Sequence, residues 1–189
     1  MTEDQLTDDD LEIIIPENID FEIGDNVVYP HHGAGQVLRK ELRKMFGKEM
    51  QYLTIKILHN DMTVMVPCEN AGIAGLRRVI DEETVKKVLG VLEDDVSEMP
   101  KNWNRRFKHN RDKIKTGDIY ELAEVVRNLA LREHEKGLST GEKQMYTRAK
   151  KILASELMYA LEKSEDDAEA YLDDLLKSSA ERLAAAAKV

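Results

Sequence analysis

The spacing of apolar residues changes once along this 189-residue chain. From Phe21 to Pro67 they tend to alternate with polar residues, as in MQYLTIKIL at 50–58. Beyond residue 80 they recur three and four positions apart. A period of two places side chains on one face of a strand, whereas a period near 3.6 places them on one face of a helix. The sequence therefore predicts a β module followed by an α module.

The β module is expected to contain short strands joined by tight turns. The candidate segments are NVVYP, GAGQVLRKEL, MQYLTIKIL and DMTVMVP, with a turn at His59, Asn60 and Asp61. So few short strands cannot form a wide sandwich. A small barrel of the Tudor or SH3 type is the natural closure, because it removes exposed sheet edges.

Capping signals divide the α module into four or five helices. An N-cap residue stands before each of several helical runs, and Gly137 can end one of them. Three of these caps are followed, three residues later, by an acid that can complete a capping box. The candidate N-caps are Asp81, Asp118, Ser139 and Ser164.

The expected fold class is α+β, with an N-terminal small Tudor/SH3-like β-barrel followed by a C-terminal all-α helical bundle. Residues 1–20 are expected to form a flexible acidic leader, and 21–75 the β domain. Residues 76–180 are expected to form the helical domain, and 181–189 a frayed C-terminal end.

Charge is unevenly distributed along the chain. The net charge is −9, and residues 1–20 carry eight acids and no bases. Residues 101–116, by contrast, carry seven bases and one acid, a net charge of +6. The acidic total argues against nucleic acid as a partner, but phosphate binding depends on the local patch. The basic segment is therefore a candidate nucleic-acid contact.

The only tryptophan of the chain, Trp103, lies in this basic segment, PKNWNRRFKHNRDKIK at 100–115. Two interpretations remain open at this point. Trp103 and Phe107, four residues apart, could pack one helix face into the bundle. Alternatively, the indole could be displayed near the start of its helix, to stack on or wedge beside an opened base step. The second interpretation assigns phosphate or groove contacts to Asn104, Arg105, Arg106 and Lys108.

Enzyme signatures are missing from the sequence. It contains neither G-x-x-x-x-G-K-[ST] nor G-x-S-x-G. His31 and His32 are adjacent and would point to opposite faces of a strand, which is unfavourable for binding one metal ion. We expect no enzyme, no cofactor and no metal site. An enzyme that uses these histidines remains a rival hypothesis.

The expected compartment is the cytoplasm. Cys68 is the only cysteine, so no internal disulfide can form. The acidic N-terminal segment differs from the basic start of a secretion signal, and the sequence has no apolar run of about 18 residues. We expect no membrane contact.

Five segments together resemble the CarD family of bacterial transcription regulators. They are FEIGDNVVYPHHGAG at 21–35, TVMVPCENA at 63–71, NWNRRFKHN at 102–110, AEVVRNL at 123–129 and KGLSTGEK at 136–143. They occur in the family's order and spacing, and the resemblance extends from about Phe21 to Leu176.

The resemblance implies a transcription regulator whose Tudor-like module docks on the β subunit of RNA polymerase. It further implies that the helical domain contacts promoter DNA at the upstream edge of the transcription bubble. A tryptophan at the position of Trp103 would then lie against the minor groove and stabilise the open complex. This implication favours display of the indole over core packing.

The resemblance also assigns individual residues. Arg105, Arg106 and Lys108 match the basic positions beside the tryptophan, and Lys143 is a further candidate phosphate contact. Arg43 matches a polymerase-contacting arginine, whereas Met65 stands where some members have arginine. We expect a monomer with weak, sequence-independent DNA binding on its own. The rival interpretation is a polymerase- or protein-binding adaptor with a purely structural Trp103 and no DNA contact.

Overall fold

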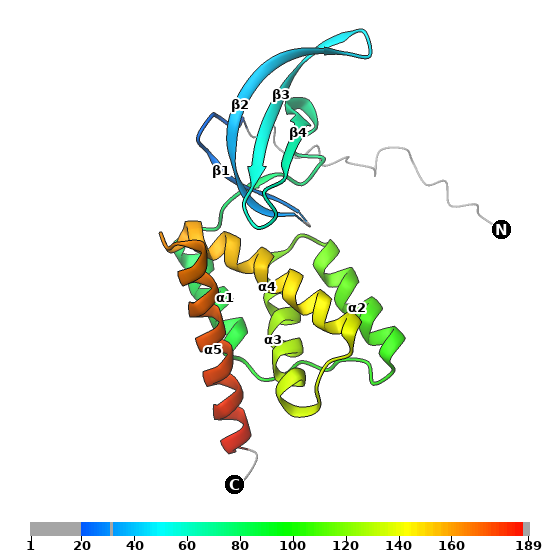
Figure 1. Ribbon diagram of the computed structural model, residues 1–189, viewed down its shortest axis with the longest axis vertical. Coiled ribbons are helices and arrows are strands. Elements are labelled where there is room, and N and C mark those ends of the chain that lie inside the picture. Colours follow the sequence, from blue (N-terminus) through cyan, green and yellow to red (C-terminus); the bar gives the residue numbers. More distant parts are fainter. Residues whose placement is uncertain (1–19, 31, 187–189) are drawn as a thin grey trace, which may run out of the picture.

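The computed structural model describes residues 20–30 and 32–186, and it consists of a β module and a helical module (Figure 1). The predicted acidic leader falls almost entirely on residues 1–19, outside the described residues, as do His31 and residues 187–189.

One antiparallel sheet forms the β module, in the strand order β4-β3-β2-β1-β5. Its apolar core is built around Phe21, Val27, Leu53 and Ile55. A 3₁₀ turn, η2, follows β4 at Cys68–Asn70. The strands are β1 (Asn26–Tyr29), β2 (Gly33–Met45), β3 (Lys48–Ile57), β4 (Thr63–Pro67) and β5 (Arg77–Arg78).

The α+β class with a small Tudor-like β module is confirmed, but the predicted closure of the barrel is wrong. The sheet is open, because β4 and β5 form its two edges and do not pair with each other in the described chain. β5 has only two residues and pairs with β1 alone. So short an edge strand offers few backbone groups for closing the sheet onto β4.

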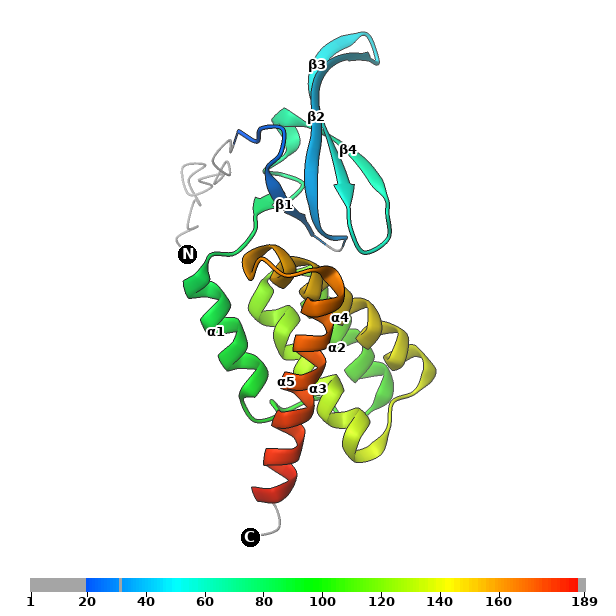
Figure 2. The ribbon, with the colours of Figure 1, turned by 60° about the vertical axis from the view of Figure 1, so that its left-hand side comes forward.

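The hairpin formed by β2 and β3 projects beyond the rest of the sheet (Figures 1 and 2). Its register runs from the pair Gly35 and Ile57 to the pair Met45 and Lys48 at the tip. The strands are buried near the sheet's core and become exposed towards the tip. The tip is therefore held mainly by cross-strand pairing.

Among the described residues the α module contains five helices. They begin largely where the capping signals predicted. Ser139 and Glu142 form a complete capping box, and the side chain of Asp81 accepts a hydrogen bond from the Thr84 amide. The helices are α1 (Glu82–Glu93), α2 (Trp103–Lys115), α3 (Ile119–Lys136), α4 (Thr140–Ala160) and α5 (Glu165–Ala186).

The last helix continues further than expected. α5 extends through Ala186, so residues 181–186 are helical rather than frayed. Alanine, which dominates this end, has the highest helix propensity of the amino acids. The side chain of Arg182 also donates a hydrogen bond to the carbonyl oxygen of Glu93, at the end of α1.

The two modules are joined by α4, which lies against the start of β2 and the linker after β5. Ser155 Oγ accepts a hydrogen bond from the Ala34 amide at 3.0 Å. The buried Glu156 carboxylate accepts hydrogen bonds from both terminal nitrogens of Arg77, at 2.6 and 3.0 Å. It also accepts one from the Ile80 amide, at 3.1 Å. These contacts connect the sheet to the bundle at several points.

Candidate nucleic-acid interface

Trp103 lies at the first position of α2, and its ring is neither buried in the bundle nor free. The side chain is 43% exposed. Its Nε1 donates a hydrogen bond to Ser139 Oγ at 2.9 Å, and its ring stacks on Phe107 with centroids 5.2 Å apart. The indole is thus fixed on one side and accessible on another.

The sequence places this ring through two helix starts. The side chain of Asn102 caps α2, because its Oδ1 accepts a hydrogen bond from the Arg105 amide at 3.1 Å. This bond fixes the first turn, which carries Trp103. The first turn of α4 passes close by at Gly141. A Cβ on Gly141 would lie 3.6 Å from Trp103 Cζ2 and 3.4 Å from Phe107 Cε2, so both rings lie directly against α4.

Arg106 is buried, whereas its predicted role as a DNA contact requires an exposed side chain. It is 4% exposed, its Nε donates to Glu142 Oε1 at 2.6 Å, and its NH1 donates to the carbonyl oxygens of Pro100 and Lys101. A guanidinium held in this way is not available to a DNA phosphate. The predicted DNA contact at Arg106 is therefore corrected to a contact between α2 and α4.

Electrostatics explain why this buried pair is ionised. Burial raises the pKa of Glu142, but hydrogen bonds from Arg106 and from Ser139 outweigh it, and the net shift is downwards. The same carboxylate completes the capping box of α4. Arg106 thus links the helix that carries Trp103 to the cap whose Ser139 accepts the indole N–H.

The other predicted DNA contacts are exposed. Asn104, Arg105 and Lys108 lie on the outer face of α2. Lys143, in the first turn of α4, is exposed as well, and its Nζ lies 3.4 Å from Glu133 Oε1. Surface ion pairs of this kind are weak, so Lys143 can exchange Glu133 for a phosphate at little cost. The structure brings these side chains to the Trp103 end of the bundle.

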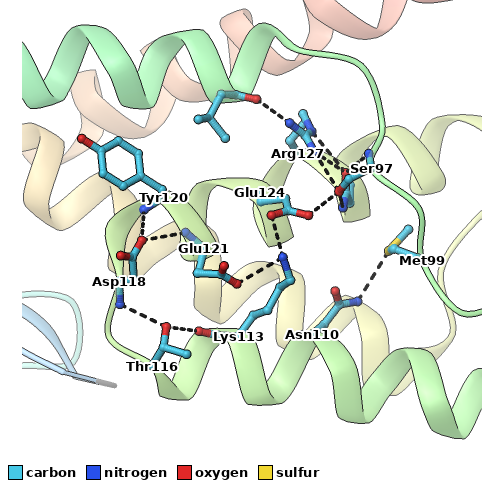
Figure 3. A network of polar contacts seen from close by, with 12 residues as sticks. Ser97, Met99, Asn110, Lys113, Thr116, Asp118, Tyr120, Glu121, Glu124 and Arg127 are labelled. Carbon is cyan, nitrogen blue, oxygen red and sulfur yellow. Dashed lines mark hydrogen bonds and ion pairs between the residues drawn. The ribbon is translucent and has the colours of Figure 1, made fainter.

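A polar network holds α2 and the segment before it against α3 (Figure 3). Arg127 donates to the carbonyl oxygen of Val91 at 2.9 Å and to Ser97 Oγ at 3.0 Å. Lys113 on α2 forms ion pairs with Glu124 at 2.6 Å and Glu121 at 3.1 Å. This network fixes the direction of α2 and therefore the position of its first residue.

Glu124 stands at the centre of that network. It pairs with Lys113 and also accepts a hydrogen bond from Ser97 Oγ. Burial raises the pKa of Glu124, but the hydrogen bonds from Lys113 and Ser97 outweigh it and leave the pKa below its ordinary value. The network is therefore charged at neutral pH.

The two predicted polymerase contacts share one face of the sheet without touching. Met65 pairs with Thr54, which pairs with Arg39, and Arg43 lies four residues further along β2. Directly paired residues and every second residue point to the same face. Met65 is 40% exposed, and the exposed Arg43 pairs with Glu41 at 2.5 Å.

Sequence reasoning missed the most exposed aromatic of the described chain. Phe46, at the hairpin tip, is 98% exposed, and Leu42 on β2 is 72% exposed. The signal for the tip was Gly47, which marks a two-residue turn between the alternating segments. The hairpin belongs to the β module, whereas Trp103 begins α2 in the helical module.

No group of three or more metal-ligating side chains occurs within residues 20–30 and 32–186. Across the same ranges, every helix is too short or too polar to span a bilayer.

Two family models match the chain in the order of its modules. The CarD-like/TRCF RID domain matches residues 21–80, and the CarD C-terminal domain matches residues 87–173. A Bacillus subtilis (strain 168) protein, named "Putative transcription factor YdeB", is 40% identical over 137 residues, which cover 72% of this chain and 90% of that protein.

A solved structure is also similar. It is the solution NMR structure of the 72-residue N-terminal domain of Myxococcus xanthus CarD, at 27% identity and a TM-score of 0.28, with 34% of this chain and 89% of that domain covered. The matches to both family models and to YdeB extend over both modules. The chain therefore belongs to the CarD family of transcription factors, with an N-terminal RNA polymerase-interacting domain.

Proposed function

We propose that this protein docks on the β subunit of RNA polymerase through its β module and stabilises the open promoter complex. In this proposal Trp103 lies against the minor groove at the upstream edge of the bubble. The observation that carries the proposal is the indole itself, which is 43% exposed yet held by Ser139 and Phe107. A fixed, accessible ring is ready to wedge beside an opened base step.

The packing favours this function over an adaptor with a structural tryptophan. The main apolar cluster of the bundle is formed by residues such as Val88, Leu92, Leu153 and Leu157, and Trp103 is not among them. A tryptophan whose role was to fill the core would be expected in that cluster, because burial of its large apolar surface is its main contribution to stability.

The mechanism requires only a difference in affinity. A protein that binds the open complex about 1.4 kcal/mol more tightly than the closed complex raises the ratio of open to closed about tenfold. Docking on polymerase supplies a high effective concentration, so the DNA contact can be weak by itself. This reconciles a local basic patch with a chain of net charge −9.

The test is the lifetime of open complexes on purified polymerase, with and without the protein, at two salt concentrations. Wild-type protein is expected to lengthen the lifetime, and more so at low salt. Trp103→Ala is expected to remove about tenfold of that gain, since stacking of a base on an aromatic ring is worth about 1–3 kcal/mol.

Val96→Ala is the matched control, because Val96 is an apolar side chain exposed to a similar degree, 46%, and lies outside the β module that is proposed to dock on polymerase. Trp103→Ala should retain polymerase affinity and lose well under the roughly 3–5 kcal/mol that a core tryptophan contributes. A large loss of stability, with an unchanged lifetime when corrected for folded protein, would support the adaptor instead.

A further inference from the structure

An open groove lies between α2 and α4, next to Trp103. Its volume is about 790 Å³, within the range of ligand-binding clefts, roughly 300–1,000 Å³. Its apolar part is formed by Phe107, Ile114 and Met145, all of them half-buried. Phe107 also stacks on Trp103, so the groove lies directly beside the exposed indole.

Cations line both sides of this groove. Arg111 and Lys115, one helical turn apart, come from α2, and Arg148 comes from α4. No acidic side chain is among its lining residues in the described chain. The protein as a whole has a net charge of −9, yet cations without neighbouring acids gather in this groove. This local positive charge favours a polyanion as the ligand.

We propose that this groove receives the unpaired DNA strand that leaves the fork at Trp103. The bases would lie on the apolar side chains, and the phosphates would meet Arg111, Lys115 and Arg148. This inference rests on the proposed function, because it takes Trp103 as the point where DNA reaches the protein.

The chemistry of the groove favours a single strand over a duplex. A duplex keeps its bases stacked inside, so a protein contacts mainly its phosphates and the base edges in its grooves. Neither of these packs favourably on apolar side chains. An unpaired strand exposes base faces, which stack on aromatic side chains irrespective of sequence. Among the described residues that line the groove, Gln144 alone has an uncharged polar side chain, so little sequence preference is expected.

The first test measures binding of the full-length chain by fluorescence anisotropy at low ionic strength. The probes are a labelled duplex and the same duplex with one unpaired arm, prepared with the arm on either strand. Wild type is expected to prefer one of the forks over the duplex by about tenfold.

Two double variants separate the groove from overall charge. Arg111→Gln with Lys115→Gln removes two groove cations and is expected to abolish most of the preference for the fork. Lys86→Gln with Lys177→Gln is the control, because it removes the same charge from exposed positions on α1 and α5. That control is expected to leave the ratio of fork to duplex affinity unchanged.

A second test adds a single negative charge. Gln144→Glu keeps the size of the side chain and is expected to weaken fork binding several-fold while changing duplex binding much less. Gln51→Glu, an identical exchange at an exposed position of β3, should leave both affinities unchanged.

Two results would overturn the proposal. One is equal affinity for fork and duplex in the wild type. The other concerns a chain that lacks residues 1–19. If this truncation raises the affinity for the fork, and the groove variants remove that rise, the groove binds the chain's own acidic segment rather than DNA. Either result leaves the proposed function open to its own test, the effect of Trp103→Ala on open-complex lifetime.

Discussion

Arg106 reduces the number of cations that the basic segment can present to DNA, because it is buried. Of the cations around Trp103, Arg105 and Lys108 are exposed, whereas Arg106 is buried against Glu142. The positive patch is therefore smaller than the sequence implied, and its position depends on an internal ion pair. Removing one partner of a buried pair leaves an uncompensated charge, which costs about 3–5 kcal/mol.

Glu142→Gln is therefore expected to destabilise the protein by about 3 kcal/mol, a fall in melting temperature of roughly 6–12 °C. Glutamine preserves the shape of the side chain, so the loss reports the charge together with the hydrogen bonds that the replaced carboxylate oxygen accepts. Glu83→Gln is the matched control, because Glu83 is exposed and forms a surface ion pair with Lys87, at 2.7 Å. Thermal unfolding at neutral pH measures both.

The same pair predicts a pH dependence. The folded-state pKa of Glu142 lies below its ordinary value of 4.5, so the contribution of its charge to stability is complete above that value. It is lost as the pH falls from there through the lowered pKa. The stability difference between wild type and Glu142→Gln should shrink over this acidic range, and a constant difference would contradict the ionised pair.

Among the elements, the β2–β3 hairpin carries the most conspicuous conflict between local preference and structure. Phe46 has φ 53° and Gly47 has φ 79°, the two positive angles of a type I′ turn. Asparagine, not phenylalanine, is favoured at the first of these positions. An aromatic residue in a strained conformation and almost fully exposed points to a role in docking.

Phe46→Asn is accordingly expected to raise stability by about 0.5 kcal/mol, because strain of this kind costs on the order of 1 kcal/mol. It is also expected to weaken polymerase binding about tenfold, as loss of an aromatic anchor does. Chemical denaturation and affinity for purified polymerase measure the two effects. Unchanged affinity would place the hairpin tip outside the docking surface.

Prediction from sequence succeeded where the determinants are local. The N-caps Asp81 and Ser139 depend on residues three positions away, and the helices begin as predicted. Burial of Arg106 could not be foreseen, because its partner lies 36 residues away. The open sheet likewise depends on which strands meet in space. The groove was missed, although the spacing of Arg111 and Lys115 already placed two cations on one face of α2.

Over the whole molecule, the joint between the modules sets the distance from hairpin to indole. Ser155 and Glu156, adjacent on α4, hold Ala34 of β2, Arg77 of β5 and the amide of Ile80. Glu156 is 1% exposed, so these bonds are shielded from water. A molecule joined in this way is expected to present Trp103 to DNA at a fixed position relative to the polymerase.

The most direct measurement of the central proposal is DNA cleavage from beside Trp103 in the open complex. A DNA-cleaving iron chelate would be attached at Asn104→Cys in a chain that also carries Cys68→Ala. The control attaches it at Ser178→Cys, an exposed position on α5. Cleavage from position 104 confined to a few base pairs at the upstream edge of the bubble is the predicted result. No cleavage there, or the same pattern from position 178, would contradict it.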